Sequence, residues 1–179
     1  MNRVIIFVLF CCCGTLFAQS RKVVETCTDV AMFVPSVAGA VISFVEGDKE
    51  GFWQLVGSGA TSVAAAYALK YTVAKERPDG SDNHSFPSNH TGLAFAGATY
   101  IQQRYGWKYA VPAYIVGGSV AWGRVYARRH DVYDVLAGSV LGSGCAMLLT
   151  TRFAEKHNLS LVPFATQHGN AGVCLFAVF

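Results

Sequence analysis

Apolar stretches alternate with short polar breaks along most of the chain, and this pattern predicts a set of packed helices. Val30–Val45 is the first candidate helix, with Pro35 near its start, and the charged turn Glu46–Glu50 follows it. The other predicted helices are Gly51–Lys75, Thr91–Arg104, Pro112–Arg124 and Asp131–Arg152. No internal repeat or low-complexity linker interrupts this order, so the sequence predicts one helical domain.

Three further stretches depart from the helical pattern. Turn-forming residues fill Pro78–Pro87, which indicates a loop between two of the predicted helices. Beyond Asn158, the short apolar stretches Leu159–Pro163 and Val173–Phe179 are predicted to be extended. We therefore expect an all-α fold, a compact helical bundle of about five to six helices, followed by two short extended segments.

The balance of apolar and charged residues raises the question of a membrane. Hydrophobic residues make up 53% of the chain and charged residues 14%, whereas an average soluble domain has about 25% charged residues. Within the predicted helices, the longest stretch without Asp, Glu, Lys or Arg is Gly51–Leu69, at 19 residues. A membrane span needs about 20 predominantly apolar residues. We expect a membrane-embedded or membrane-associated bundle, and a tight soluble bundle remains the alternative.

The N-terminus has the pattern of an export signal. Arg3 precedes the uncharged run Val4–Phe17, which is short for a membrane span and typical of a signal-peptide core. We expect residues 1–20 to be a signal peptide, cut after Ser20 or after Ala18, and residues 21–179 to form a single domain. An uncleaved anchor helix is the alternative. A lipoprotein signal is disfavoured because no small residue precedes any cysteine in the run Cys11–Cys13.

Charge and cysteine usage exclude several function classes. The net charge of +3 comes without a basic run, which argues against a nucleic-acid partner. Cleavage of the signal would leave Cys27, Cys145 and Cys174, so at most one disulfide can form within a monomer. No Cys/His cluster has the spacing of a zinc site, and we expect neither a metal nor another cofactor.

Two short segments in the middle of the chain suggest an anion site. Lys70 and Arg77 are seven residues apart, which would place both cations on one face of a helix that Pro78 ends. Ser88 is a plausible N-cap for the following helix, so Asn89 and His90 would lie in its first turn. Unpaired N–H groups at such a helix start bind anions well. Taken alone, each segment also fits a bland explanation: a solvated basic helix end, or an ordinary cap with a surface histidine.

A third segment carries Arg124, His130 and Asp134. The last two are four residues apart, so they would be neighbours on one helix face. A carboxylate bound to one imidazole nitrogen fixes the tautomer and leaves the other nitrogen free to act as a nucleophile. An ordinary helix-start pair is the bland explanation here, and metal ligation lacks a third ligand with suitable spacing.

Together and in this order, the three segments resemble the signature of the type 2 phosphatidic acid phosphatase superfamily, which includes class A acid phosphatases and vanadium haloperoxidases. The family pattern is Lys, six residues, Arg-Pro; then Pro-Ser-Gly-His; then Ser-Arg, five residues, His, three residues, Asp. The resemblance covers roughly Asp48 to Leu149. Two positions depart from the pattern: Asn89 stands in place of the glycine, and Gly123 stands in place of the serine.

The resemblance implies a metal-independent phosphatase that forms a phosphohistidine intermediate. His130 would attack phosphorus, Asp134 would orient His130, and His90 would protonate the leaving oxygen. The residues implied to hold the phosphate are Lys70, Arg77, Ser88, Asn89 and Arg124. Asn89 keeps the backbone N–H that the family's glycine offers to phosphate, so we expect activity to survive that substitution.

These inferences lead to an expected function. We expect an exported phosphoric monoester hydrolase acting on a lipid phosphate: phosphatidic acid, phosphatidylglycerol phosphate, an isoprenyl diphosphate or lipid A. It would reside in the periplasm, or in the inner membrane with its active site facing the periplasm. The alternatives are a soluble broad-specificity acid phosphatase, a vanadate-dependent haloperoxidase, and a non-enzymatic membrane or binding module. The oligomeric state stays open, and Arg128 and Arg129 are expected to face solvent or lipid headgroups.

Overall fold

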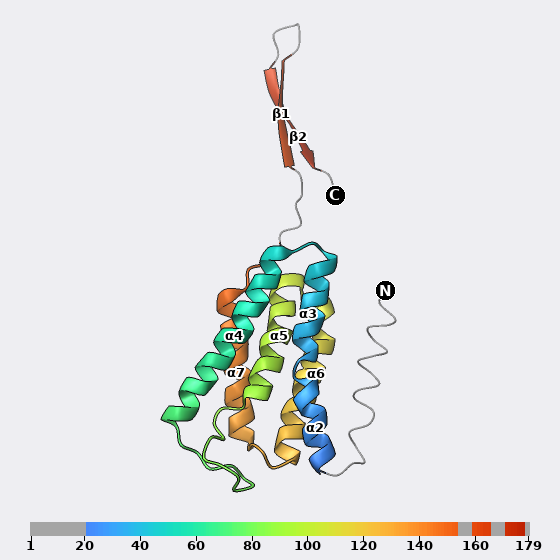
Figure 1. Ribbon diagram of the computed structural model, residues 1–179. Coiled ribbons are helices and arrows are strands. Elements are labelled where there is room, and N and C mark those ends of the chain that lie inside the picture. Colours follow the sequence, from blue (N-terminus) through green and yellow to red (C-terminus); the bar gives the residue numbers. More distant parts are fainter. Residues whose placement is uncertain (1–20, 154–158, 166–170, 178–179) are drawn as a thin grey trace.

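The computed structural model describes residues 21–153, 159–165 and 171–177 (Figure 1). The helices are α2 (Arg21–Ala31), α3 (Val34–Val45), α4 (Lys49–Thr72), α5 (Asn89–Tyr105), α6 (Trp107–Tyr126) and α7 (Val132–Leu149), and the strands are β1 (Leu159–Ala165) and β2 (Ala171–Ala177). The predicted all-α bundle is thus confirmed. The predicted signal peptide, residues 1–20, lies outside the described residues and stays a prediction.

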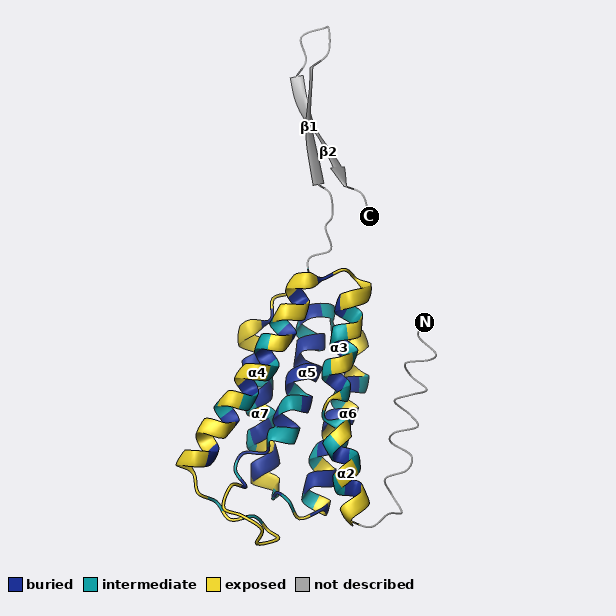
Figure 2. Cartoon of the chain, viewed as in Figure 1, coloured by how far each residue is buried: buried dark blue, intermediate teal, exposed yellow. Residues whose placement is uncertain are grey.

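Helix α5 is the centre of the bundle. It packs against α3, α4, α6 and α7, and it is the most deeply buried of these helices (Figure 2). Its inner positions include Ala94, Ala96 and Ala98, whose small side chains allow neighbouring helices to come close. The loop between α4 and α5 and the turn between α6 and α7 both lie at the end of the bundle where α5 begins (Figure 1).

The closest helix approach joins α5 to α7. A Cβ atom added at Gly142 would collide with the Gly92 carbonyl oxygen, and one added at Gly138 would collide with the Ser88 carbonyl oxygen. The backbone N–H of Ser88 also donates to the Asp134 carbonyl at 3.0 Å. The two backbones are therefore in direct contact, and only glycine fits at these α7 positions without displacing α5.

Several predicted helix boundaries were wrong. The predicted helix Val30–Val45 contains α3, which starts at Val34, whereas α2 ends at Ala31 and was not predicted. Pro35 explains the break, since it has no N–H to donate to the preceding turn and its fixed φ suits the first turn of α3. Helix α6 starts at Trp107 and not at Pro112, and α7 ends at Leu149 and not at Arg152. The predicted helix Gly51–Lys75 ends earlier, at Thr72, and Val73 caps it in a non-helical conformation. Both predicted extended segments do form strands, which pair antiparallel from Leu159 opposite Ala177 to Ala165 opposite Ala171.

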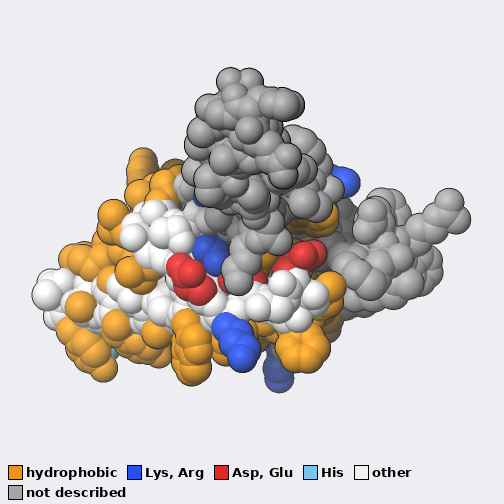
Figure 3. Space-filling view, turned by 90° about the horizontal axis from the view of Figure 1, so that it is seen from above, with side chains coloured by type: hydrophobic (Ala, Val, Ile, Leu, Met, Phe, Trp, Pro, Cys, Tyr) orange, Lys and Arg blue, Asp and Glu red, His pale blue; other side chains and the backbone are white. Residues whose placement is uncertain are grey.

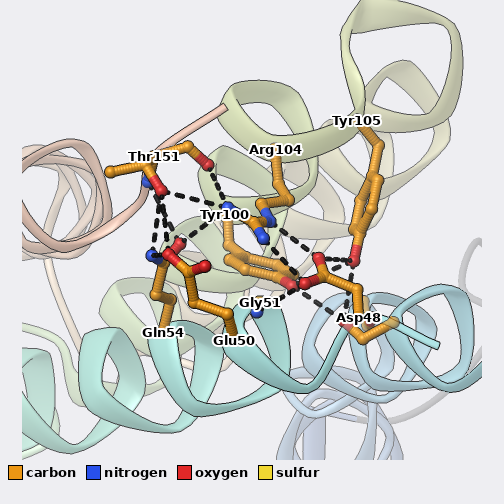
Figure 4. A network of polar contacts seen from close by, with 10 residues as sticks. Asp48, Glu50, Gly51, Gln54, Tyr100, Arg104, Tyr105 and Thr151 are labelled. Atoms are coloured by element: carbon orange, nitrogen blue, oxygen red, sulfur yellow. Dashed lines mark hydrogen bonds and ion pairs between the residues drawn. The ribbon is translucent and has the colours of Figure 1, made fainter. Parts of the chain in front are cut away.

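A buried polar network closes the end of the bundle opposite the start of α5 (Figure 4). The guanidinium of Arg104 donates to both carboxylate oxygens of Asp48, each at 2.7 Å, and both side chains are almost fully buried. The hydroxyl of Tyr105 and the backbone N–H of Gly51 also donate to this carboxylate. Arg104 further donates to the carbonyl oxygen of Thr151, at 2.8 Å. Fully paired in this way, the buried charges join the start of α4, the end of α5 and the segment after α7.

The sides of the bundle are unusually apolar. In the view from the end where α4 begins, hydrophobic side chains gather along the left and lower edges, and acidic side chains lie nearer the middle (Figure 3). Two segments, Arg21–Val45 and Val132–Leu149, are long and apolar enough to cross a membrane, with mean hydropathies of 1.7 and 1.6. Only 22% and 28% of these segments are buried inside the protein, so they are not ordinary core helices. This exposure supports the predicted association with a membrane.

The contact between α5 and α7 leads to a test of stability. We expect Gly142→Ala to lower the free energy of unfolding by about 1–3 kcal/mol, because the new methyl group must push the two backbones apart. Gly144→Ala, on the same helix, is the matched control, since a Cβ atom there meets nothing within 4 Å. Thermal unfolding in detergent compares the two variants. Equal melting temperatures for both would show that the helices do not depend on this close approach.

Candidate active site

The three sequence segments come together at the end of the bundle where α5 begins. A cavity of about 230 Å³ opens there. Five of the predicted site residues line it: Lys70, Arg77, Asn89, His90 and His130; Tyr67, Tyr71 and His84 complete its wall. Ser88, Arg124 and Asp134 are buried beside it without lining it. Cations, histidines and a helix N-terminus thus share one small hollow.

Lys70 lies in the last turn of α4 and is almost fully buried. Its Nζ donates to the His84 carbonyl oxygen at 2.6 Å, which holds the loop against the end of the helix. Burial, followed by the repulsion of nearby Arg77, lowers the pKa of Lys70 to about 8. The lysine is therefore still mostly charged at neutral pH, and an anion in the cavity would stabilise its charged form.

Arg77 lines the cavity, but it is carried by a loop and not by the predicted helix. Because α4 ends at Thr72, Arg77 does not share a helix face with Lys70 but lies in the following loop. Its Nε donates to the Asp82 carboxylate at 2.7 Å, and the same carboxylate oxygen accepts the backbone N–H of His84 at 2.8 Å. The loop, rather than a helix, positions this cation. The Arg77 hydrogen bond also holds the pKa of Asp82 below its usual range.

The start of α5 has the geometry that the sequence predicts. Ser88 is the N-cap, and its hydroxyl accepts the backbone N–H of Thr91 at 3.5 Å. Asn89 and His90 follow in the first turn and line the cavity. The side-chain oxygen of Asn89 is buried and has no hydrogen-bond partner. The positive end of the helix dipole therefore adjoins the cavity.

Asp29 is a site residue that the sequence analysis missed. Its Oδ1 lies 2.9 Å from Nε2 of His90 and 2.6 Å from a guanidinium nitrogen of Arg124. Burial and then Arg124 lower the pKa of His90 to about 4, while Asp29 opposes that shift. No local signal marked Asp29, because Arg21, Lys22 and Glu25 precede it and it is one of several charges on α2.

His130 precedes α7 instead of lying on it. The helix begins at Val132, after the N-cap Asp131, so the predicted shared helix face is wrong. The two predicted partners are still close, with Nδ1 of His130 3.7 Å from the Asp134 carboxylate. This distance is an ion-pair separation, and Nδ1 has no hydrogen-bond partner. Burial, followed by Lys70, Arg124 and Arg77, lowers the pKa of His130 to about 3, so its ring is neutral at neutral pH.

The Asp134 carboxylate is held mainly by groups outside the predicted set. Lys75 donates to Oδ1 at 2.7 Å, and the hydroxyl of Ser85 and the backbone N–H of Asp131 donate to Oδ2. Arg129 plays a similar structural part: it pairs with Glu25 and Asp79, each at 2.8 Å, and does not simply face solvent as predicted. Both cations tie the loop between α4 and α5 to the neighbouring helices.

Within residues 21–153, where side chains are described, no group of three or more His, Cys, Asp or Glu side chains has a geometry that could hold a metal ion. The charge near the cavity instead comes from Lys70, Arg77 and Arg124. Together with the N-terminus of α5, these three cations provide a setting in which a phosphate dianion is stabilised and a neutral histidine lies within reach.

Comparison with known proteins gives several matches. The sequence profile of the PAP2 superfamily matches residues 75–158. A lipid A 4'-phosphatase of Helicobacter pylori is 30% identical over 149 residues, covering 77% of this chain and 75% of that protein. A lipid A 1-phosphatase of the same species is 25% identical over 139 residues, covering 73% and 70%. A lipid A 1-phosphatase of Porphyromonas gingivalis is 40% identical over 78 residues, covering 42% of this chain and 18% of that protein. No solved structure matches.

The profile match starts after Lys70 and Asp29 and contains the loop, the α5 N-terminus and the third segment. The first of the H. pylori relatives extends the similarity over most of both chains. These matches confirm the family that the three motifs indicate: this chain belongs to the PAP2 superfamily.

Proposed function

We propose that this protein removes a phosphate group from lipid A through a phosphohistidine intermediate on His130. Family membership and the lipid A phosphatase relatives make the chain a phosphoric monoester hydrolase that acts on a phosphorylated lipid. The observation that carries the mechanism is the neutral, buried ring of His130 on a cavity lined by two of the cations. A nucleophile and a phosphate-binding charge are thus placed together.

The first chemical step uses the lone pair of His130. One ring nitrogen attacks phosphorus, a P–N bond forms, and the P–O bond to the lipid breaks. The ring acquires positive charge in this step, and the Asp134 carboxylate, 3.7 Å from Nδ1, stabilises that charge. Lys75 and Ser85 keep the carboxylate in place while this happens. Asp134 therefore acts by orientation and electrostatics and does not take the proton itself.

Three cations neutralise the phosphate. Lys70 and Arg77 line the cavity, and Arg124 retains a buried Nε–H without a partner while Asp29 binds its other end. The charge of a transferring phosphoryl group is spread over its equatorial oxygens, so several fixed donors are more useful than one. The first backbone N–H groups of α5, at Asn89 and His90, supply further donors. In our proposal these groups do the work that metal ions do in other phosphatases.

His90 supplies the proton for the leaving oxygen. In the phosphate-free site its pKa is about 4, because burial and Arg124 disfavour the charged ring. A bound phosphate dianion offsets Arg124 and raises that pKa, so the ring gains a proton as the substrate enters. In the second step the neutral ring accepts a proton from the water that attacks the phosphohistidine. Asp29, at 2.9 Å, stabilises the ring when it is protonated, which is before the first step and after the second.

The surface of the bundle suits a lipid substrate. Apolar side chains exposed on α3, α6 and α7 include Val37, Val41, Ile115, Val140 and Leu148. The two apolar segments and the lipid A phosphatase relatives indicate a membrane protein. The predicted export signal would place the catalytic end of the bundle on the periplasmic side. This exposed apolar surface also argues against a soluble acid phosphatase.

The nucleophile is tested by substitution. We expect His130→Ala to release phosphate from lipid A at least about 10³-fold more slowly than the wild type, because the covalent route disappears. Tyr133→Leu is the control, since Tyr133 lies at the same end of the bundle and does not line the cavity. Both assays include EDTA. Activity that required a divalent metal, or that persisted in His130→Ala, would contradict the proposed mechanism.

The role of Asp29 is tested by the pH profile. Asp29 raises the pKa of His90, so the pKa of His90 should fall in Asp29→Asn. Arg124, no longer paired with a carboxylate, should lower this pKa further. As the general acid, His90 must be protonated, and activity falls when the pH rises through its pKa in the enzyme–substrate complex. We therefore expect the alkaline limb of kcat to move down by about one pH unit or more. Asp79→Asn, which removes a carboxylate from Arg129 instead, is the control, since Arg129 is not among the groups that shift the pKa of His90. If the alkaline limb of kcat stayed at the same pH in Asp29→Asn, Asp29 would have no effect on the general acid.

A further inference from the structure

We propose that Tyr67, Tyr71, His84 and the side-chain amide of Asn89 form a subsite for the sugar ring that carries the scissile phosphate. The inference rests on the proposed function and adds to it the substrate class that the site selects: a lipid phosphorylated on a pyranose ring, in preference to one phosphorylated on glycerol. None of these side chains is needed for the chemistry on phosphorus described above.

The cavity has more room and more kinds of surface than a phosphate requires. Its volume of about 230 Å³ corresponds to roughly eight water molecules, whereas a phosphate group has five heavy atoms. Two of its lining residues, Lys70 and Arg77, are cations, and three others, Tyr67, Tyr71 and His84, are aromatic. The aromatic part thus adjoins the phosphate-binding part within one hollow, as a site for a phosphate and its attached group requires.

The two tyrosines are presented to a ligand and not to the protein core. Tyr67 and Tyr71 are one helical turn apart on α4, and they are 50% and 77% exposed. The Tyr71 ring meets the His84 ring edge to face, with centroids 5.6 Å apart and an interplanar angle of 71°. Aromatic rings carry negative charge on their faces, and the C–H groups of a pyranose carry the opposite partial charge. A sugar ring therefore has a suitable surface against this wall, and a flexible glycerol has no comparable flat face.

The aromatic wall is fixed relative to the phosphate-binding cations. The His84 carbonyl oxygen accepts from Lys70, and the His84 backbone N–H donates to Asp82, which pairs with Arg77. The spacing between the His84 backbone and the two cations is therefore set by hydrogen bonds, and the His84 ring is packed against Tyr71. A rigid substrate, in which the phosphate and the ring are directly bonded, benefits from such a fixed spacing.

Asn89 contributes a hydrogen-bond acceptor that the family's pattern lacks. Its side-chain oxygen is buried in the cavity wall without a partner, which is unusual for a buried polar atom. The family's glycine has no such atom. A hydroxyl or amide N–H next to the phosphate would satisfy it, and acylated amino sugars such as those of lipid A offer both groups. Asn89 in place of the family's glycine thus points to a sugar ring as the ligand, as the aromatic wall does.

The experiment compares two lipids on the same enzyme preparation. Phosphate release is measured for lipid A and for phosphatidic acid in identical detergent micelles, and the ratio of the two kcat/KM values is the readout. Because both values come from one preparation, a loss of folded protein cancels in the ratio. We expect Tyr67→Leu/Tyr71→Leu to lower the ratio by about five- to tenfold, from the lost contribution of two aromatic faces.

Two further variants separate the sugar subsite from other roles of the tyrosines. Tyr71→Phe keeps the ring face and should keep the ratio. Tyr133 is 76% exposed, close to the 77% of Tyr71, but it does not line the cavity. Tyr133→Leu should therefore leave the ratio unchanged. If the tyrosines were only membrane-interface anchors, the double variant would lose activity on both lipids equally, and this result would overturn the subsite.

The remaining outcomes distinguish the subsite from the function on which it rests. A wild-type enzyme that hydrolyses both lipids, with a ratio that the double variant does not change, would overturn the subsite alone. A wild-type enzyme that hydrolyses phosphatidic acid and not lipid A would overturn both the subsite and lipid A as the proposed substrate, and would leave a lipid phosphatase. Phosphate release from neither lipid would overturn the proposed function and the subsite together.

Discussion

Backbone contact between α5 and α7 is the constraint on which the active site depends. Glycines at positions 138 and 142 of α7 let the first turns of α5 come within direct contact, and the Ser88 N–H bonds to the Asp134 carbonyl across the interface. The same few residues carry the helix start that adjoins the cavity and the carboxylate that lies near His130. Helix packing and catalytic geometry are therefore set by one interface, and a larger side chain in α7 would disturb both.

The second constraint is electrostatic. Lys70, Arg77 and Arg124 are brought close to two histidines in a largely buried region, and such a cluster repels itself when no anion is present. The protein manages this charge by pairing Arg77 with Asp82 and Arg124 with Asp29, and by keeping both histidines neutral. In the proposed mechanism, a phosphate dianion enters a site whose donors are already in place. The cost of assembling the charges is met during folding and not during turnover.

Much of this arrangement was predictable from the sequence, because the helices follow the apolar pattern and the motifs occur at fixed spacing. The N-cap Ser88 and the proximity of His130 to Asp134 follow from local rules. The position of Arg77 did not follow, because spacing alone could not show that α4 ends at Thr72 and that a loop carries the cation instead. Asp29 and Lys75 depend on contacts between residues far apart in the chain, which no local pattern encodes.

The pairing of Asp29 with Arg124 also affects how far the chain can be shortened. The superfamily profile begins at residue 75, so a fragment trimmed to it would keep Arg124 and lose α2. Arg124 is nearly fully buried, and without Asp29 its charge would have no carboxylate beside it. The boundary of the profile match is thus not the boundary of the candidate active site, because α2, which precedes the match, supplies Asp29.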